Sequence, residues 1–267
     1  MDVEDRSFRR TVRSGSLLLL FVGCSAPDTS GIRLVGHGGL GPNGDHPMDT
    51  REALLGALER GMDGVEMDVQ LTQDSVLVAF HDLDLAEKTA CEGPINSHTW
   101  DQLKNCTDEE RNGDTYPIVR LDSLLLEATT KFPKAEFTFD IKLNTKGEWW
   151  PYLHAFTNAI SKLAMHPEAK NRIVIECQTK DFLQLMHDEA LEIPLFLYGS
   201  EPQLAIELAT ELGCTGITMD NDRITAADVA GALDTGLQVT LFGISGDGDL
   251  RSAADKKPGR IQLDHDH

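Results

Sequence analysis

Two acidic side chains and two histidines have the types and spacing of a site that combines a divalent cation with acid–base groups. Glu66 and Asp68 lie in the run Gly-Val-Glu-Met-Asp-Val, where the alternation of a β-strand points both carboxylates to one face. Two carboxylates in this arrangement can share a divalent cation. His37 precedes them in Leu-Val-Gly-His-Gly-Gly, and His81 follows them in Val-Ala-Phe-His-Asp. Imidazole can accept or donate a proton near neutral pH, so the set combines a cation site with acid–base groups.

A second short strand carries a third carboxylate and a cation. In Glu-Phe-Thr-Phe-Asp-Ile-Lys, Asp140 and Lys142 share one face and apolar residues share the other. Charged groups survive burial only when they are paired or metal-bound, so we expect the charged faces of the two strands to form one polar site. Each charge taken alone is also compatible with an ordinary ion pair at a strand end. The whole set, with two histidines, favours a functional site.

The composition of the 267-residue chain is that of an ordinary globular protein, with 40% hydrophobic and 25% charged residues. Acidic residues outnumber basic ones by 44 to 24, which gives a formal net charge of −20, and no basic stripe suggests nucleic-acid binding. An anionic substrate would meet a repulsive overall field, which a bound cation and Lys142 would have to reverse locally. We expect one catalytic domain with a small-molecule substrate, no nucleic-acid partner and no obligate protein partner.

Strand-like and helical patterns alternate along the chain, and these elements must position the charged residues. Strands are predicted at 32–36, 64–70, 136–142, 172–177, 194–198, 216–219, 238–242 and 260–263. Helices are predicted between them at 121–130, 150–164, 181–189, 203–212, 226–234 and 249–254, with a first helix before Gly61. This alternation predicts an α/β fold, a closed (β/α)₈ TIM barrel. The predicted site residues then fall at the C-terminal strand ends, at one mouth of the barrel.

The first helix has the clearest start signal. Asp49 and Glu52 have the spacing of a capping box, apolar residues recur at helical spacing, and Gly61 ends the helix. A later helix opens with Trp149 and Trp150, which we expect to pack rather than to form a substrate rim.

The region after the second strand departs from the barrel pattern. Residues 76–81 form another strand-like run after a turn, and we expect them to fold back as a hairpin that returns His81 to the carboxylates. Residues 82–117 are poor in barrel signals and are predicted to form a small insertion over the mouth. Cys91 and Cys106 lie within this insertion and are a possible disulfide pair.

The first 24 residues combine a basic patch, a short apolar run and a cysteine. The apolar run is too short to span a bilayer, and a small residue stands directly before Cys24. This pattern resembles a bacterial lipoprotein export signal, in which the cysteine is acylated. We expect residues 1–24 to direct export and anchor the chain to a membrane, on the periplasmic side or the cell surface. Residues 25–30 would form a short tether before a barrel domain at 31–267. The alternative for the first 24 residues is a short buried helix with an incidental cysteine.

The two other cysteines, Cys177 and Cys214, lie beside apolar strand-like runs. We expect them to be packed thiols. The sequence has no Cys-x-x-Cys pair, so a thiolate zinc site is not predicted.

The segment 34–142 resembles the glycerophosphodiester phosphodiesterase family, and the barrel pattern extends the resemblance to the C-terminus. The family's histidine at the end of the first strand falls on His37, and its Glu-x-Asp motif falls on Glu66 and Asp68. Its later His-Asp falls on His81 and the following residue, and the turn Thr-Gln-Asp after the second strand also matches.

This resemblance implies hydrolysis of glycerophosphodiesters to glycerol phosphate and an alcohol. One divalent cation, Mg²⁺ or Ca²⁺, would be held by Glu66, Asp68 and Asp140. Lys142 would contact the substrate phosphate. His37 and His81 would be the catalytic acid and base, in an order that the sequence leaves open.

The chain departs from the family at three positions. The family commonly has His-Arg where this chain has His37 and Gly38, so an expected phosphate-contacting arginine is missing. The family's Pro-Glu-Asn-Thr is Pro-Met-Asp-Thr in this chain, so Met48 replaces the glutamate. Asp140 replaces a common Glu, and the sphingomyelinase D-like phospholipases, which this site also resembles, use Asp-x-Lys there. Two alternatives to hydrolysis therefore remain: a phospholipase D-like lyase that gives a cyclic phosphate, and a noncatalytic, surface-anchored binding lipoprotein.

Overall fold

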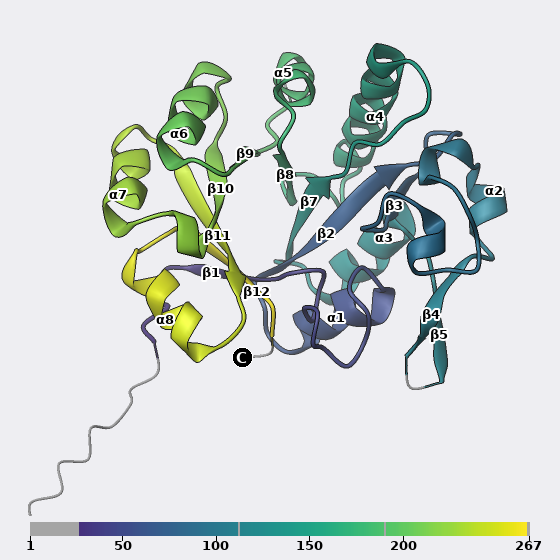
Figure 1. Ribbon diagram of the computed structural model, residues 1–267, viewed down its shortest axis with the longest axis horizontal. Coiled ribbons are helices and arrows are strands. Elements are labelled where there is room, and N and C mark those ends of the chain that lie inside the picture. The colour runs from purple at the N-terminus through teal and green to yellow at the C-terminus, as the bar shows by residue number, and fades with distance from the viewer. Residues whose placement is uncertain (1–26, 112, 190, 266–267) are drawn as a thin grey trace, which may run out of the picture.

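In the computed structural model, which describes residues 27–111, 113–189 and 191–265, eight parallel strands close into a barrel (Figure 1). Around the circle the strands are β1 (Arg33–Gly36), β2 (Gly64–Leu71), β7 (Glu136–Ile141), β8 (Ile173–Cys177), β9 (Leu195–Gly199), β10 (Gly216–Asp220), β11 (Gln238–Ile244) and β12 (Arg260–Leu263). The circle is closed because β1 pairs with both β12 and β2. The predicted TIM barrel is confirmed, whereas the predicted export signal with Cys24 lies outside the described residues.

Helices follow the strands and cover the outside of the barrel (Figure 1). They are α1 (Arg51–Glu59), α3 (Leu121–Lys131), α4 (Trp149–Ala164), α5 (Lys180–Asp188), α6 (Pro202–Glu211), α7 (Ala226–Asp234) and α8 (Asp247–Asp255), with a short 3₁₀ turn η3 (Asn221–Arg223) after β10. Throughout the described ranges, each helix is too short or too polar to cross a bilayer.

The start of α1 corrects the predicted capping box. Its N-cap is Thr50, whose side chain accepts a hydrogen bond from the Ala53 N–H at 3.2 Å. The prediction of Asp49 as N-cap is wrong by one residue. Asp49 instead has a left-handed φ of +63°, which directs its carboxylate away from the helix and toward β2.

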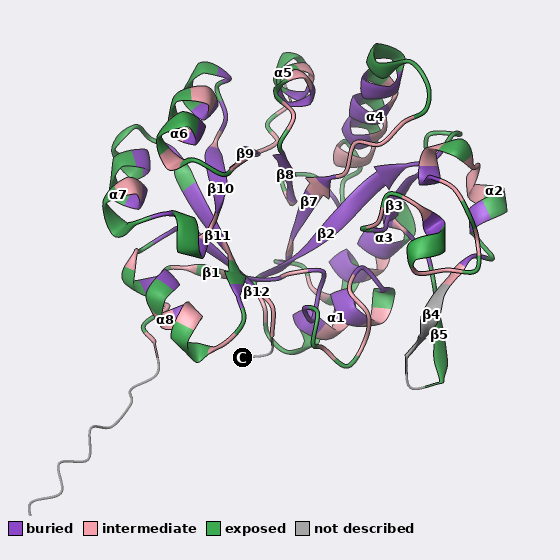
Figure 2. Cartoon of the chain, viewed as in Figure 1, coloured by how far each residue is buried: buried purple, intermediate pink, exposed green. Residues whose placement is uncertain are grey.

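Strand alternation separates an apolar layer from a polar barrel interior. Val65 and Met67 of β2 are buried in the main hydrophobic core, which lies between the strands and the surrounding helices (Figure 2). Glu66 and Asp68 alternate with them and point into the barrel. The same pattern recurs in β7, so the polar groups of the two strands lie side by side where the strands pair.

The chain between β2 and α3 forms an additional, smaller layer beside the barrel. β3 (Leu77–Ala79) runs antiparallel to β2, as the hairpin prediction expected, and β6 (Val119–Arg120) pairs with β3. Between them lie η1 (Leu85–Glu87), η2 (Ile95–Ser97), α2 (Trp100–Leu103), β4 (Thr107–Arg111) and β5 (Asp114–Pro117). This insertion has a hydrophobic core of its own, in which Phe80 packs with Leu85, Ile95 and Leu103.

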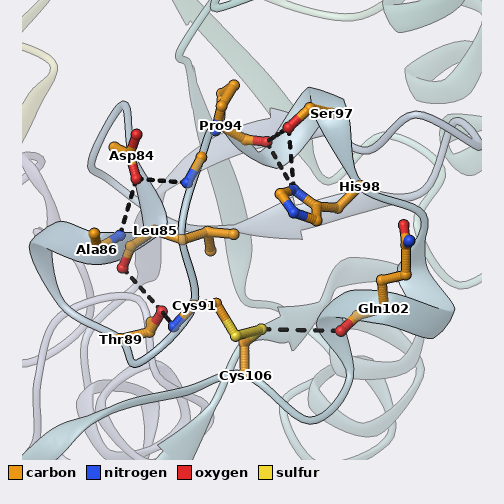
Figure 3. The surroundings of a disulfide bond; sticks show 11 residues. Asp84, Leu85, Ala86, Thr89, Cys91, Pro94, Ser97, His98, Gln102 and Cys106 are labelled. Atoms are coloured by element: carbon orange, nitrogen blue, oxygen red, sulfur yellow. Dashed lines mark hydrogen bonds between the residues drawn. A yellow bond between two sulfur atoms is a disulfide. The ribbon is translucent and has the colours of Figure 1, made fainter.

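A disulfide between Cys91 and Cys106 joins two parts of the insertion (Figure 3). Nearby, the Thr89 hydroxyl donates to the Leu85 carbonyl at 2.8 Å, and the Gly93 N–H donates to the Asp84 carboxylate at 2.7 Å. These bonds hold the chain around the disulfide in compact turns. The remaining described cysteines, in β8 and just before β10, are buried thiols.

The two tryptophans at the start of α4 are more exposed than expected. Trp149 is 37% exposed and Trp150 is 53% exposed, so neither side chain is fully buried. The Trp149 ring lies 6.3 Å from the Tyr152 ring, and Tyr152 supplies the buried aromatic contact of this helix end. Both tryptophans stand in the first turn of α4, after the loop that follows β7.

Candidate active site

Three carboxylates meet at the C-terminal ends of β2 and β7. Glu66 and Asp68 come from β2, and Asp140 is the β7 residue paired with Asp68. One oxygen from each of the three lies within 4.8 Å of the others. Glu66 Oε1 and Asp68 Oδ2 are buried and have no hydrogen-bond partner among the described residues. Clustered oxygen donors of this kind suit a hard divalent cation such as Mg²⁺ or Ca²⁺.

Lys142 partly balances the charge of this cluster. Its Nζ lies 2.6 Å from Asp140 and 2.9 Å from Asp68. Burial opposes ionisation of Asp68, but the charges of Lys142 and His81 outweigh it and lower the pKa of Asp68. Burial and the neighbouring acids raise the pKa of Glu66 well above its usual range, and burial also raises the pKa of Asp140. One lysine therefore does not stabilise all three carboxylates in their charged form.

His37 follows β1 and is held by a residue at the end of the neighbouring strand. Its Nδ1 lies 2.5 Å from Asp264, which follows β12, and its Nε2 lies 3.9 Å from Glu66. Burial opposes protonation of His37, but the hydrogen bond and charge of Asp264 outweigh it and raise the pKa of His37. With a hydrogen on Nδ1, the ring donates to Asp264 and directs its free nitrogen toward the carboxylates.

His81 reaches the same mouth from the end of the β2–β3 hairpin. The N–H of Phe80 donates to the Asp68 carbonyl at 2.8 Å, which brings the residues after β3 beside the cluster. His81 Nδ1 lies 2.8 Å from one carboxylate oxygen of Asp82, and Lys88 of the insertion lies 3.4 Å from the other. His81 thus has the same arrangement as His37, with a carboxylate at Nδ1 and Nε2 free.

The site contains residues that sequence reasoning missed. Asp264 was assigned no role from the sequence. It directly follows β12, just as His37 directly follows β1, and it stands two residues after Gln262, which faces the barrel interior. Asp49 was assigned to a helix cap, yet its Oδ1 accepts a hydrogen bond from the Asp68 N–H at 2.9 Å. Strand alternation offered a signal for Asp264, but no local pattern indicated the contact of Asp49.

Two departures from the family pattern are complementary in space. Gly38 has a φ of +54°, and its N–H donates to Glu66 at 2.9 Å. A Cβ added at Gly38 would lie 2.5 to 2.7 Å from three side-chain atoms of Met48. The side chain of Met48 therefore occupies the space in which the Cβ of a larger residue 38 would lie.

Further polar groups line the barrel interior. Arg260 pairs with Glu136 at 2.8 Å, and its guanidinium lies 5.2 Å from the Phe196 ring centroid. Glu176, which the sequence left unassigned, accepts a hydrogen bond from Gln262 at 2.8 Å. Arg260 and Glu136 are the first residues of β12 and β7, at the end of the barrel opposite the mouth, whereas Glu176 is the β8 residue paired with Asp140.

Comparison with known proteins identifies relatives over most of the chain. Residues 40–256 match the model of the glycerophosphoryl diester phosphodiesterase family, and this segment begins three residues after His37. A glycerophosphodiester phosphodiesterase from Bacillus altitudinis is 28% identical over 152 residues, which are 55% of this chain and 59% of that protein. The uncharacterized protein YqiK of Bacillus subtilis is 30% identical over 39% of this chain and 42% of its own length. The chain thus matches less than two thirds of either relative.

Solved structures share the fold along nearly the whole barrel. A glycerophosphodiester phosphodiesterase from Parabacteroides distasonis superposes with a TM-score of 0.73 at 20% identity, covering 88% of this chain and 93% of that one. A phosphodiesterase from Oleispira antarctica, in complex with the product sn-glycerol-3-phosphate, gives a TM-score of 0.74 at 19% identity with the same coverage. At these identities the likeness establishes the barrel fold.

Proposed function

The chain belongs to the glycerophosphoryl diester phosphodiesterase family, and we propose that it hydrolyses glycerophosphodiesters to glycerol phosphate and an alcohol in a cation-dependent reaction. The observation that carries this proposal is the meeting, at one barrel mouth, of a three-carboxylate cluster, a lysine and two histidines that are each bound to a carboxylate. The product named for the Oleispira antarctica structure supports the substrate class.

Charge neutralisation is the first requirement at this acidic mouth. A divalent cation held by Glu66, Asp68 and Asp140 would neutralise the phosphodiester and polarise a non-bridging oxygen. Lys142 lies between two of these carboxylates, 24% exposed, and would supply a second positive contact for the phosphate. The missing arginine at Gly38 makes Lys142 the main side-chain cation of the phosphate site.

Proton transfer is the second requirement. Asp264 and Asp82 hold Nδ1 of His37 and His81, which leaves Nε2 of each ring free for the substrate. One imidazole would take the proton of the nucleophile, and the other would donate a proton to the leaving alcohol. The nucleophile is water in direct hydrolysis, or the glycerol hydroxyl next to the phosphate in a route through a cyclic phosphate.

Product analysis tests the proposal against its two alternatives. The full chain is incubated with a panel of glycerophosphodiesters and lysophospholipids, with Mg²⁺ or Ca²⁺, and products are followed by ³¹P NMR. Release of a glycerol phosphate supports hydrolysis, whereas a cyclic phosphate that persists would assign the lyase. Absence of turnover from folded protein, with any substrate and either cation, would favour the binding lipoprotein.

We also propose that the chain is exported and anchored to a membrane through Cys24, from the pattern of its first 24 residues. β1 begins at Arg33, near Glu136 at the start of β7, and ends beside His37. An anchor preceding β1 would therefore hold the barrel at the end opposite its mouth and leave the site open to soluble substrates. Membrane fractionation tests this: the wild-type protein should sediment with membranes and Cys24→Ser should not, and equal distributions would refute it.

A further inference from the structure

Asp49 is fixed beside the carboxylate cluster by the backbone of β2. It is only 6% exposed, and its Oδ1 accepts a hydrogen bond from the Asp68 N–H at 2.9 Å. Its left-handed backbone, with φ of +63°, is a conformation that Asp and Asn tolerate better than most residues. The carboxylate is therefore held in one orientation, next to a residue of the cation site.

The second oxygen of Asp49 lacks a partner. Asp49 Oδ2 is buried without a hydrogen bond from the described residues, as are Glu66 Oε1 and Asp68 Oδ2. Burying an ionised carboxylate without compensation is costly, and within the described ranges only Asp68 of these three residues has a cation, Lys142, at hydrogen-bond distance. Lys142 pairs with Asp68 and the β7 carboxylate. Burial and the charges of Asp68 and Glu66 raise the pKa of Asp49 well above its usual range, which agrees with a local shortage of positive charge.

We propose that Asp49 is an outer carboxylate of the cation site, which strengthens cation binding without joining the inner ligand set. The inference rests on the proposed cation dependence and adds a residue to it. Asp49 is outside the compact group whose oxygens lie within 4.8 Å of one another, so its charge would act through Asp68 or through a water on the cation. Outer groups of this kind change metal affinity by about 10- to 100-fold.

The local fold does not require the negative charge of Asp49. An asparagine side chain also tolerates the left-handed conformation and offers an Oδ1 acceptor for the same Asp68 N–H. Asp49→Asn therefore removes a charge while keeping the hydrogen bond, and it separates an electrostatic role from a structural one.

Direct binding of the cation tests this role without relying on turnover. Calorimetric titration of the chelated full chain with Ca²⁺ and with Mg²⁺ should show at least about 10-fold weaker binding to Asp49→Asn than to wild type. On adding Ca²⁺, the melting temperature of the variant should rise by less than that of wild type.

The matched control is Asp63→Asn. Asp63 also accepts a backbone hydrogen bond, from the Leu34 N–H at 2.9 Å, but it is exposed and lies before β2, at the other end of the strand from the site. Its cation affinity should equal that of wild type. Equal affinities of wild type and Asp49→Asn would overturn the inference and leave the proposed function intact. Loss of folding in Asp49→Asn would also overturn it, since the charge would then be structural; absence of binding to wild type would instead remove the cation site itself.

Discussion

His37 and His81 each have one ring nitrogen, Nδ1, bound to a carboxylate. Asp264 binds Nδ1 of His37 at 2.5 Å, and Asp82 binds Nδ1 of His81 at 2.8 Å. A carboxylate in this position fixes the ring orientation and favours the tautomer with hydrogen on Nδ1. In the proposed mechanism these two carboxylates, which come from distant parts of the chain, orient the rings for proton transfer.

Asp264→Asn should reduce turnover while the barrel remains folded. The amide can hold the ring in the wrong tautomer and no longer stabilises the imidazolium, so we expect kcat to fall by about 10²-fold or more with a smaller change in KM. Steady-state kinetics on a glycerophosphodiester measures both constants. Asp249→Asn is the control, because the partly exposed Asp249 accepts a hydrogen bond from the Ser245 hydroxyl, at 2.7 Å, and contacts neither histidine of the site. Unchanged kcat in Asp264→Asn would refute the positioning role.

At the level of elements, an ion-pair cluster connects α1 to α3. Arg51 of α1 donates to both carboxylate oxygens of Glu127 of α3, and Lys131 lies 2.8 Å from the same group. The hydrogen bond from Arg51 has the largest effect, followed by the hydrogen bond from Lys131, and together they lower the pKa of Glu127 to about 2. A carboxylate whose pKa is lowered by folding stabilises the protein above its unfolded pKa, near 4.5, and this stabilisation is lost as the pH falls toward 2.

Glu127→Gln should therefore be less stable than wild type at neutral pH, by at most about 1 kcal/mol, because the pair is partly exposed. The difference should shrink as the pH is lowered from 5 toward 2, which chemical denaturation at several pH values can measure. A difference that stays constant over this pH range would show that the ionised carboxylate does not contribute.

The disulfide of the insertion offers a second test at this scale. Cys91 and Cys106 are separated by 15 residues, and a closed loop of this length is expected to contribute about 3 kcal/mol. The double variant Cys91→Ser/Cys106→Ser should lose a comparable part of its stability. Dithiothreitol should destabilise the wild type and leave the double variant unaffected; an equal response of both proteins would exclude the disulfide as the cause.

The elements were predictable from the sequence to a greater extent than the contacts of single side chains. The eight strands follow from apolar runs and alternation, which directly reflect burial against helices. Asp49 and Thr50 are both good N-cap residues, so propensity could not decide between them, and the contact of Asp49 with Asp68 depends on how the loop before α1 packs on β2. The pairing of Asp264 with His37 requires the barrel to close, because 227 residues separate the two.

At the scale of the whole molecule, the negative net charge repels the anionic substrate that the site is proposed to bind. The chain carries a formal charge of −20, and several of its carboxylates are buried together at the barrel mouth. Lys142 alone does not reverse this field for a phosphodiester anion, so a bound cation is the natural source of the missing positive charge. The barrel and its insertion bring these groups together, and the cation would complete the site.

Cation-dependent turnover is the decisive property of this arrangement. The full chain should be freed of metal with EDTA, and glycerol phosphate release should then be measured before and after Mg²⁺ or Ca²⁺ is restored in excess. We predict that chelation abolishes turnover, that at least one cation restores it, and that Asp140→Asn responds only weakly to either. Full activity of the chelated wild-type protein would contradict the assignment of the three carboxylates as a cation site.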